Sequence, residues 1–212
     1  MCPIPRQSYR IIHIDSLDTL LRRNALHAPS TCPNDGLPYT GIHAVQTQRD
    51  RSHRQVPCGP RGAIRDYVGF YFGPRSPMLL RIQTGWNVAM VDQANILYLV
   101  STVQTVTNTG LGLVFTDGHS LAAFTNWFDD VAHLNQIDWR MVRATQWNDT
   151  AVKPDRQRRK QAEFLVHRSM PWSLILRIGV LTAAVRRRAE AILDGHPAVH
   201  RPVVEVQHSW YY

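Results

Sequence analysis

Cysteine is scarce in this chain, and its spacing excludes a disulfide-stapled scaffold. The 212 residues contain three cysteines, Cys2, Cys32 and Cys58, which form no Cys-x-x-Cys pair and are odd in number. A small disulfide-rich protein would show an even set at short spacings. We therefore expect ordinary reduced thiols.

Long apolar runs are also missing. The longest candidate, residues 172–184, is interrupted by Arg177 and falls short of the ~20 residues that span a bilayer. The first six residues contain no apolar segment of the kind that opens a secretory signal. We expect a cytoplasmic protein with no membrane partner.

Two familiar site motifs are incomplete. His196 and His200 stand four residues apart, but Gly195 and Pro197 break the helix that would place them on one face, so we expect no metal. Residues 110–112 contain two glycines without the third of a dinucleotide-binding loop. They also precede an expected strand instead of a helix, which argues against a Rossmann fold.

What the chain has in excess is positive charge. Its 24 Lys+Arg against 16 Asp+Glu give a net charge of +8, which favours a polyanionic partner such as nucleic acid. The densest cationic run, residues 156–160, lies just before Glu163, which opens an apolar run. This is either a solvated surface that ends in an ordinary strand, or a fixed carboxylate beside a cationic groove.

Length and periodicity predict one mixed domain over residues 1–212, because 44% hydrophobic and 19% charged residues are typical of a globular chain with one core. Strands are expected over residues 9–14, 66–72, 96–100, 113–116, 164–166, 173–181 and 202–210. Helices are expected near 17–25 and over 78–82, 102–108, 121–128, 129–134, 137–144 and 183–193. Residues 27–62 show almost no periodicity and predict a long loop.

Several single residues invite two interpretations. His13, at the end of the first strand, is either a satisfied buried histidine or a contact for a phosphate or ribose. Met78 is as well explained by core packing as by base stacking. Arg75, between two small turn residues, is not explained by packing, and Trp147 has no periodic neighbours and so could cover a ligand.

Taken together, the motifs resemble the DarT family, bacterial toxins that attach ADP-ribose from NAD to bases in single-stranded DNA. The resemblance runs almost from end to end. The residues that carry it are 9–15 with Leu17, Arg51 and Arg54 before 56–57, 66–68 with 70–72, 74–79, 114–119, 137–139, and 161–166.

The resemblance implies an α+β fold, an ADP-ribosyltransferase-like split mixed β-sheet with short helices and an NAD cleft between the halves. It implies that Glu163 and Arg51 are catalytic and that NAD, a co-substrate, contacts His13, Ile14 and Asp15. Arg22 and Arg51 are our further candidates for contacting NAD, Arg51 because its charge suits the diphosphate. It places acceptor reading in residues 116–160, thymine being the implied base. Our candidates for contacting single-stranded DNA are Arg75, Met78, Trp147, Arg156 and Arg158.

The resemblance also implies a toxin restrained by a cognate macrodomain-type, DarG-like antitoxin. The chain departs from the family at Gly69, where proline is usual, at Ser16, where asparagine is common, and at residues 22–24, where glycine is frequent. Two alternatives stay open: a transferase of the same fold acting on RNA or protein, and a non-catalytic module that binds single-stranded nucleic acid.

Overall fold

An eight-stranded sheet runs through the protein in the order β10-β9-β4-β1-β3-β7-β5-β6. The computed structural model describes residues 6–212, so Cys2 lies outside the described residues. β9 and β10 pair in parallel and the other neighbours are antiparallel, which makes the sheet mixed. The strands are β1 (Gln7–His13), β3 (Tyr67–Tyr71), β4 (Ile96–Thr102), β5 (Leu113–Thr116), β6 (Trp127–Phe128), β7 (Glu163–His167), β9 (Arg177–Val180) and β10 (Val203–Val206).

The sheet is split between β1 and β3. These two strands share one registered pair, Tyr9 with Tyr71, whereas β1 and β4 pair along the whole of both strands, and so do β3 and β7. Two four-stranded halves therefore diverge from this point. The split mixed sheet implied by the family resemblance is confirmed.

The central strands β1 and β4 are buried on both faces. Ile12, Leu97 and Leu99 belong to the larger core, while Ile11 and Tyr98 point into a second core on the opposite face. Successive strand residues face opposite sides of a sheet, so a strand covered on both sides is continuously apolar. This explains why the sequence predicts residues 96–100 of β4 from an apolar run, whereas residues 9–14 of β1 are predicted from alternation.

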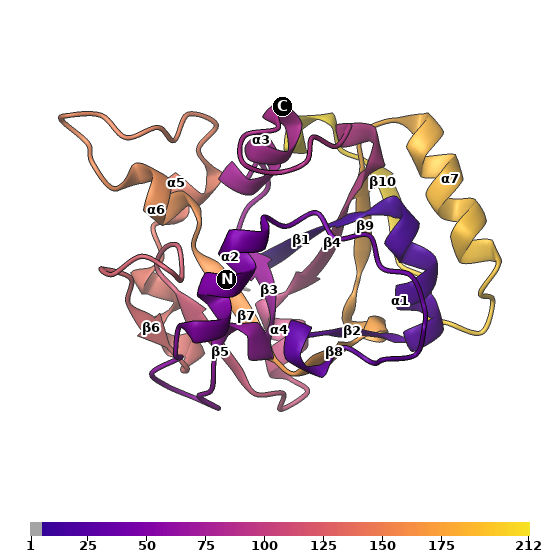
Figure 1. Ribbon diagram of the computed structural model, residues 1–212, viewed down its shortest axis with the longest axis horizontal. Coiled ribbons are helices and arrows are strands. Elements are labelled where there is room, and N and C mark those ends of the chain that lie inside the picture. The colour runs from indigo at the N-terminus through magenta and orange to yellow at the C-terminus, as the bar shows by residue number, and fades with distance from the viewer. Residues whose placement is uncertain (1–5) are drawn as a thin grey trace, which may run out of the picture.

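Helices gather at the two ends of the sheet and over its split (Figure 1). α1 and α7 lie together at one end, α5 and α6 at the other, and α2 crosses in front of β3 and β7. A small second sheet joins β2 (Ala25–His27) to β8 (Ser169–Pro171). The helices are α1 (Leu17–Arg23), α2 (Val45–His53), α3 (Pro77–Thr84), α4 (Val103–Thr107), α5 (Trp139–Arg143), α6 (Arg156–Lys160) and α7 (Ala183–Asp194).

Within residues 6–212, none of these helices combines the length and the hydropathy needed to cross a bilayer.

Two predicted helices agree well with the structure. The helix expected over residues 78–82 is α3, and the one expected over 183–193 is α7, where the Thr182 hydroxyl accepts a hydrogen bond from Val185 N. Residues 137–144 contain the shorter α5, and residues 129–134 overlap a 3-10 helix over Val131–Gln136. The spacing of apolar residues is sufficient to predict a helix where that helix packs an amphipathic face against the core.

Two expectations for irregular segments were wrong. Residues 121–128 form turns and the short β6 instead of a helix, because the Asp117 carboxylate accepts hydrogen bonds from the backbone and side chain of Asn126 and closes the loop. Residues 27–62 contain α2 and a 3-10 helix over Pro29–Thr31 instead of a continuous loop. α2 has no buried residue, so it carries no apolar stripe for periodicity to detect.

The two last strands are shorter than expected. β9 occupies only part of residues 173–181, after a 3-10 helix over Trp172–Leu174, and β10 only part of residues 202–210. The segment after β10 turns back so that Trp210 covers Gly179, where a Cβ atom would lie 2.3 Å from the indole. A folded-back aromatic thus replaces the end of the predicted strand.

Candidate active site

Glu163 is the first residue of β7 and lies opposite Tyr71 of β3. It is only 3% exposed, yet both carboxylate oxygens have partners. Oε1 accepts hydrogen bonds from Ser120 N at 3.0 Å and Ser120 Oγ at 2.6 Å, and Oε2 accepts one from Arg51 Nη1 at 2.9 Å. Burial raises the pKa of Glu163, but Arg51, His119 and the bonds from Ser120 outweigh it and leave the pKa below its ordinary value. The carboxylate is therefore ionised at neutral pH.

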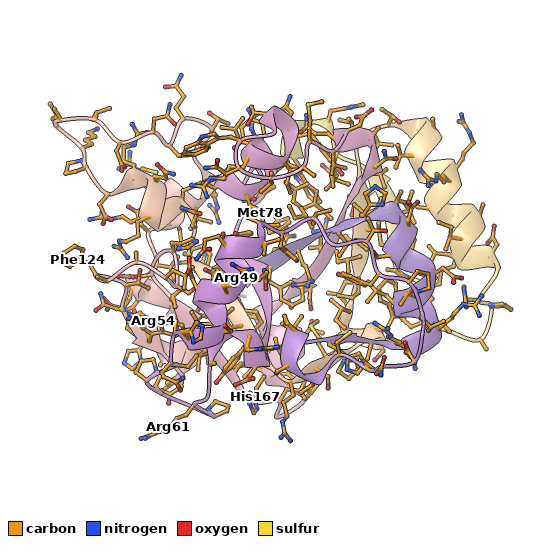
Figure 2. All side chains as sticks on the ribbon, in the orientation of Figure 1. Arg49, Arg54, Arg61, Met78, Phe124 and His167 are labelled. Carbon is orange, nitrogen blue, oxygen red and sulfur yellow. The ribbon has the colours of Figure 1, made fainter. Side chains whose placement is uncertain are left out.

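Arg51 reaches Glu163 from the last turn of α2. Its side chain is 14% exposed, whereas Arg49 and Arg54, on and just after the same helix, are exposed (Figure 2). Since no residue of α2 is fully buried, the largely buried Arg51–Glu163 ion pair is a principal attachment of this helix to the sheet. Breaking one member of such a pair leaves an uncompensated charge, so α2 and the carboxylate hold each other in place.

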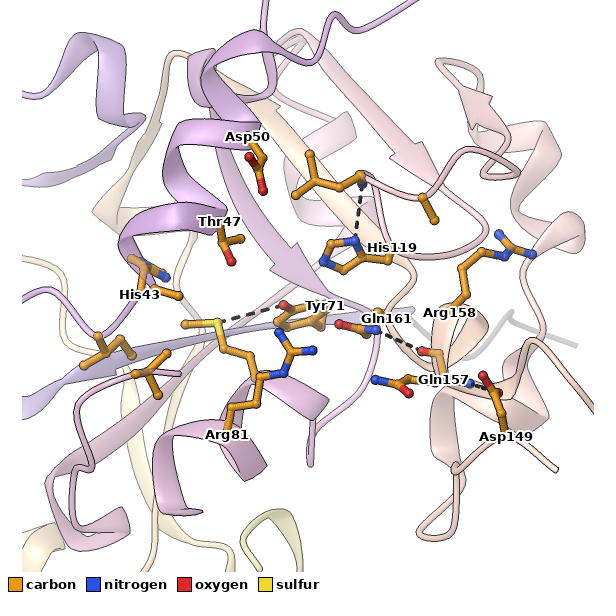
Figure 3. A pocket seen from close by; sticks show the side chains of 16 residues that line it. His43, Thr47, Asp50, Tyr71, Arg81, His119, Asp149, Gln157, Arg158 and Gln161 are labelled. Atoms are coloured by element: carbon orange, nitrogen blue, oxygen red, sulfur yellow. Dashed lines mark hydrogen bonds between the residues drawn. The ribbon is translucent and has the colours of Figure 1, made fainter. Parts of the chain in front are cut away.

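The turn after β5 supplies the remaining groups around the carboxylate. Thr116 Oγ1 accepts a hydrogen bond from Glu163 N at 3.1 Å and donates one to Gly118 O at 2.7 Å, which fixes the turn against β7. His119 Nδ1 accepts a hydrogen bond from Leu121 N at 3.3 Å, drawn in Figure 3. Burial, with help from nearby cations, lowers the pKa of His119, so the ring is neutral and carries its proton on Nε2.

Two adjoining cavities meet at this cluster, with His119 in the walls of both. The larger, about 460 Å³, is lined by polar groups that include Asp50, Gln157, Arg158 and Gln161 (Figure 3). The smaller, about 80 Å³, contains Arg10, Arg51 and Glu163 and spans β1, β3 and β7 across the split of the sheet. Both cavities share His43, Thr47, Tyr71, Met78 and His119. Two neighbouring compartments with common walls suit a reaction between two substrates.

The residues predicted to contact NAD at the start of the chain lie outside the walls of these two cavities. His13 ends β1 and its Nδ1 accepts a hydrogen bond from Asp15 N at 3.2 Å. Asp15 also pairs with Arg188 of α7 at 2.6 Å, and Arg22 pairs with Asp18 at 2.6 Å. Ile14 is fully buried.

The predicted DNA contacts fall into two groups. Met78 lines both cavities and accepts a weak hydrogen bond from Tyr71 Oη at 3.9 Å, while Arg158 lines the larger cavity. Arg158 is ion-paired with Asp117 at 2.7 Å and Asp155 at 2.5 Å, so most of its charge is already balanced.

The other three predicted DNA contacts lie near Tyr212 and outside the walls of these two cavities. The Arg75 guanidinium stacks 4.6 Å from the centre of the Tyr212 ring, and Trp147 Nε1 donates a hydrogen bond to Tyr212 Oη at 3.0 Å. Arg156 donates a hydrogen bond to Gln146 O. Trp147 is 7% exposed and packs against protein in this structure.

Sequence reasoning missed Ser120, His119, Tyr71 and His43 as site residues. The sequence predicts a turn and a family motif at residues 117–119 and an aromatic strand that contains Tyr71, but no spacing indicates that these residues meet Glu163. Within residues 6–212, no cluster of three or more His, Cys, Asp or Glu side chains is placed to hold a metal ion.

Comparison with known proteins gives consistent results along the chain. A family model described as DarT, ssDNA thymidine ADP-ribosyltransferase, matches residues 9–212. A DNA ADP-ribosyl transferase of Thermus aquaticus is 38% identical over 99% of this chain and 90% of its own length.

Two solved structures of DarT from Thermus sp. 2.9 resemble the fold closely. The complex with ADP-ribosylated ssDNA has a TM-score of 0.92 at 38% identity, covering 99% of this chain and 98% of that one. The complex with NAD⁺ has a TM-score of 0.88 at 37% identity and covers 100% of both chains.

Proposed function

The chain belongs to the DarT family of ssDNA thymidine ADP-ribosyltransferases, and from this premise we propose that the Glu163–Arg51 pair performs the transfer. The reaction uses NAD as co-substrate and single-stranded DNA as acceptor. The observation that carries the proposal is a buried, ionised carboxylate held against a guanidinium at 2.9 Å, in a cavity that shares five wall residues with a larger one. We further propose that residues 1–212 act as one catalytic domain.

Glu163 acts on both substrates in this proposal. When the bond between nicotinamide and C1′ of the ribose breaks, positive charge develops on the sugar, and a fixed anion stabilises this state more than the ground state. As the thymine ring nitrogen bonds to C1′, its proton passes to Glu163. Loss of such a base costs roughly 10²- to 10⁴-fold in rate.

Arg51 positions the reacting groups. Its charge suits the NAD diphosphate, and its fork geometry lets it bind Glu163 and a substrate oxygen together. The smaller cavity, which contains Arg10, Arg51 and Glu163, is assigned to the nicotinamide-ribose end of NAD. His13, Ile14, Asp15 and Arg22 are assigned to the remainder of the dinucleotide, with Asp15 and Arg22 first released from their surface ion pairs.

The larger cavity is assigned to the acceptor nucleotide. Thymine hides its ring nitrogen when it is paired, so the enzyme takes it from a single strand. The neutral His119 offers an N–H donor for a carbonyl oxygen of the base, and Met78 offers an apolar face. Arg75, Trp147, Arg156 and Arg158 remain our candidates for contacting the flanking strand, although Trp147 must first leave its packed position.

Partner and location follow from the family. We propose that the chain is a toxin of the cytoplasm, where its DNA substrate lies, and that a macrodomain-type, DarG-like antitoxin restrains it. Modification of single-stranded template would block replication.

The test uses the purified chain, NAD and an unstructured oligonucleotide that contains a single thymidine. We expect the oligonucleotide to gain the mass of one ADP-ribosyl group, and a version with deoxycytidine in place of thymidine to gain none. Glu163→Gln is expected to abolish the gain while calorimetric NAD binding persists. Glu190→Gln, which removes a partly exposed carboxylate paired with Arg186, is the matched control and keeps activity. A gain on RNA alone, or on neither nucleic acid, would refute the proposal.

A further inference from the structure

We propose that Ser120 is a positioning residue that occupies one oxygen of Glu163 so that the other, Oε2, receives the substrate proton. This inference rests on the proposed function and identifies which oxygen of Glu163 accepts the proton within the same site. It concerns a residue that touches the catalytic carboxylate and not the substrate.

Ser120 is placed to act on Oε1 alone. Ser120 is fully buried, and its backbone N and its hydroxyl both donate a hydrogen bond to Oε1, at 3.0 and 2.6 Å. The hydroxyl proton is therefore committed to Glu163. The hydroxyl oxygen can then accept from Arg51 Nη1, which lies 3.3 Å away. One side chain thus ties the acid and the guanidinium together.

Counting lone pairs identifies the free acceptor. Each oxygen of a carboxylate accepts about two hydrogen bonds. Oε1 has both positions filled by Ser120, whereas among residues 6–212 Oε2 accepts one bond, from Arg51 Nη1. A proton arriving from the acceptor base consequently meets Oε2. Without the Ser120 hydroxyl, the carboxyl group could rotate and present either oxygen.

The same contacts govern the protonation of Glu163. The charged or titratable groups that face it are Arg51 from α2, His119 from the turn after β5, and Tyr71 from β3. Burial favours the neutral acid, so the ionised form depends on Arg51 and on the donors of Ser120. Removing the hydroxyl takes away one donor to the anion, and the pKa of Glu163 rises.

The chain offers a direct way to observe this pKa. It contains only three glutamates, Glu163, Glu190 and Glu205, so carboxyl ¹³C-glutamate labelling gives three NMR signals, and Glu163→Gln identifies one by its loss. We expect Ser120→Ala to raise the titration midpoint of Glu163 by roughly one to two pH units. The acid limb of kcat should move by the same amount, with kcat falling roughly 10- to 100-fold and KM for NAD nearly unchanged.

Controls separate positioning from general damage. Ser101 is another fully buried serine, and its hydroxyl has no hydrogen-bond partner among the described residues, so Ser101→Ala is expected to leave the Glu163 titration and kcat unchanged. Ser120→Thr keeps the hydroxyl and should restore the acid limb. If Ser120→Thr does not fold, the titration of Glu163 in the folded Ser120→Ala variant is the deciding measurement.

The inference fails if Ser120→Ala is folded and Glu163 titrates as in the wild type. The NMR measurement needs no turnover, so its outcome is independent of whether the wild type modifies DNA. A wild type that leaves single-stranded DNA unmodified would refute the proposed function, while the titration would still test the control of Glu163 by Ser120.

Discussion

Gly69 of β3 lies directly beside the Arg51–Glu163 pair. A Cβ atom at this position would lie 3.3 Å from Arg51 Nη2 and 3.9 Å from Glu163 Oε2. The tight contact is with the end of a flexible side chain, so the guanidinium must move by a few tenths of an ångström. The departure noted at Gly69 in the sequence therefore falls next to the proposed catalytic pair.

We predict that Gly69→Ala lowers kcat/KM for oligonucleotide modification roughly tenfold, because positioning errors are costly in a preorganised site. The melting temperature should change little, since Gly69 has an ordinary negative φ and the strand is retained. Steady-state kinetics and thermal melts measure both quantities. Gly41→Ala, where a Cβ would meet nothing within 4 Å, is the control. Wild-type kcat/KM in Gly69→Ala would contradict the prediction.

The sequence predicts only those site residues that lie inside a family motif. Arg51 and Glu163 were predicted together, and the structure brings them to 2.9 Å across 112 positions of sequence; their catalytic role stays a prediction. Ser120 was not predicted, because its contact with Glu163 depends on where the turn after β5 meets β7. Arg158 looked like a free cation in sequence, but Asp117, which balances it, lies 41 residues away.

At the scale of elements, α6 is attached to α5 by an unusual bond. Lys160, the last residue of α6, is 3% exposed, and its ammonium donates a hydrogen bond to Val142 O at 2.7 Å. Burial, with a smaller effect from Arg75, lowers the pKa of Lys160 from its ordinary value of 10.5 to about 8. Folding therefore disfavours the protonated form of Lys160, which the unfolded chain retains. This destabilising group lies three residues before Glu163.

This makes stability depend on pH in a defined direction. Between about pH 8 and pH 10.5 the unfolded state binds more protons at Lys160 than the folded state does, so the free energy of unfolding rises with pH. We predict that the difference in unfolding free energy between wild type and Lys160→Met shifts in favour of the wild type by about 3 kcal/mol across this window. Urea unfolding at several pH values measures it. A constant difference would show that the ammonium is not desolvated.

Elements with an amphipathic face were predictable, and elements held by polar contacts were not. α3 and α7 bury apolar residues at helical spacing and were found. α2 has no fully buried residue and no apolar stripe, so periodicity predicts a loop there, although the family motif indicates its Arg51. The expected helix over residues 121–128 failed because Asp117 and Asn126 close a loop whose bonds no local pattern reveals.

At the scale of the whole molecule, the family resemblance supplied the arrangement that periodicity could not. The pairing of β3 with β7 joins residues about a hundred positions apart, and the break between β1 and β3 leaves no mark on either strand. Periodicity predicted most of the strands one by one. Their order, and the cavities at the split, depend on contacts between distant segments.

The net charge of +8 predicts that DNA binding weakens as salt rises. Two arginines of α6 are expected to contribute differently to this salt dependence. For single strands, log K falls with log salt by ~0.7 for each phosphate neutralised. Arg158 already pairs with Asp117 and Asp155, whereas no carboxylate in residues 6–212 lies within ion-pair distance of Arg156. We predict that Arg156→Gln reduces the salt slope for an unmodified oligonucleotide by ~0.7, and that Arg158→Gln leaves the slope unchanged while lowering the melting temperature. Fluorescence anisotropy at several salt concentrations measures both slopes.

Equal losses of slope in the two variants would contradict this prediction. They would mean that Arg158 exchanges its carboxylates for phosphate when DNA binds, and that the ion pairs of the free protein do not describe the complex.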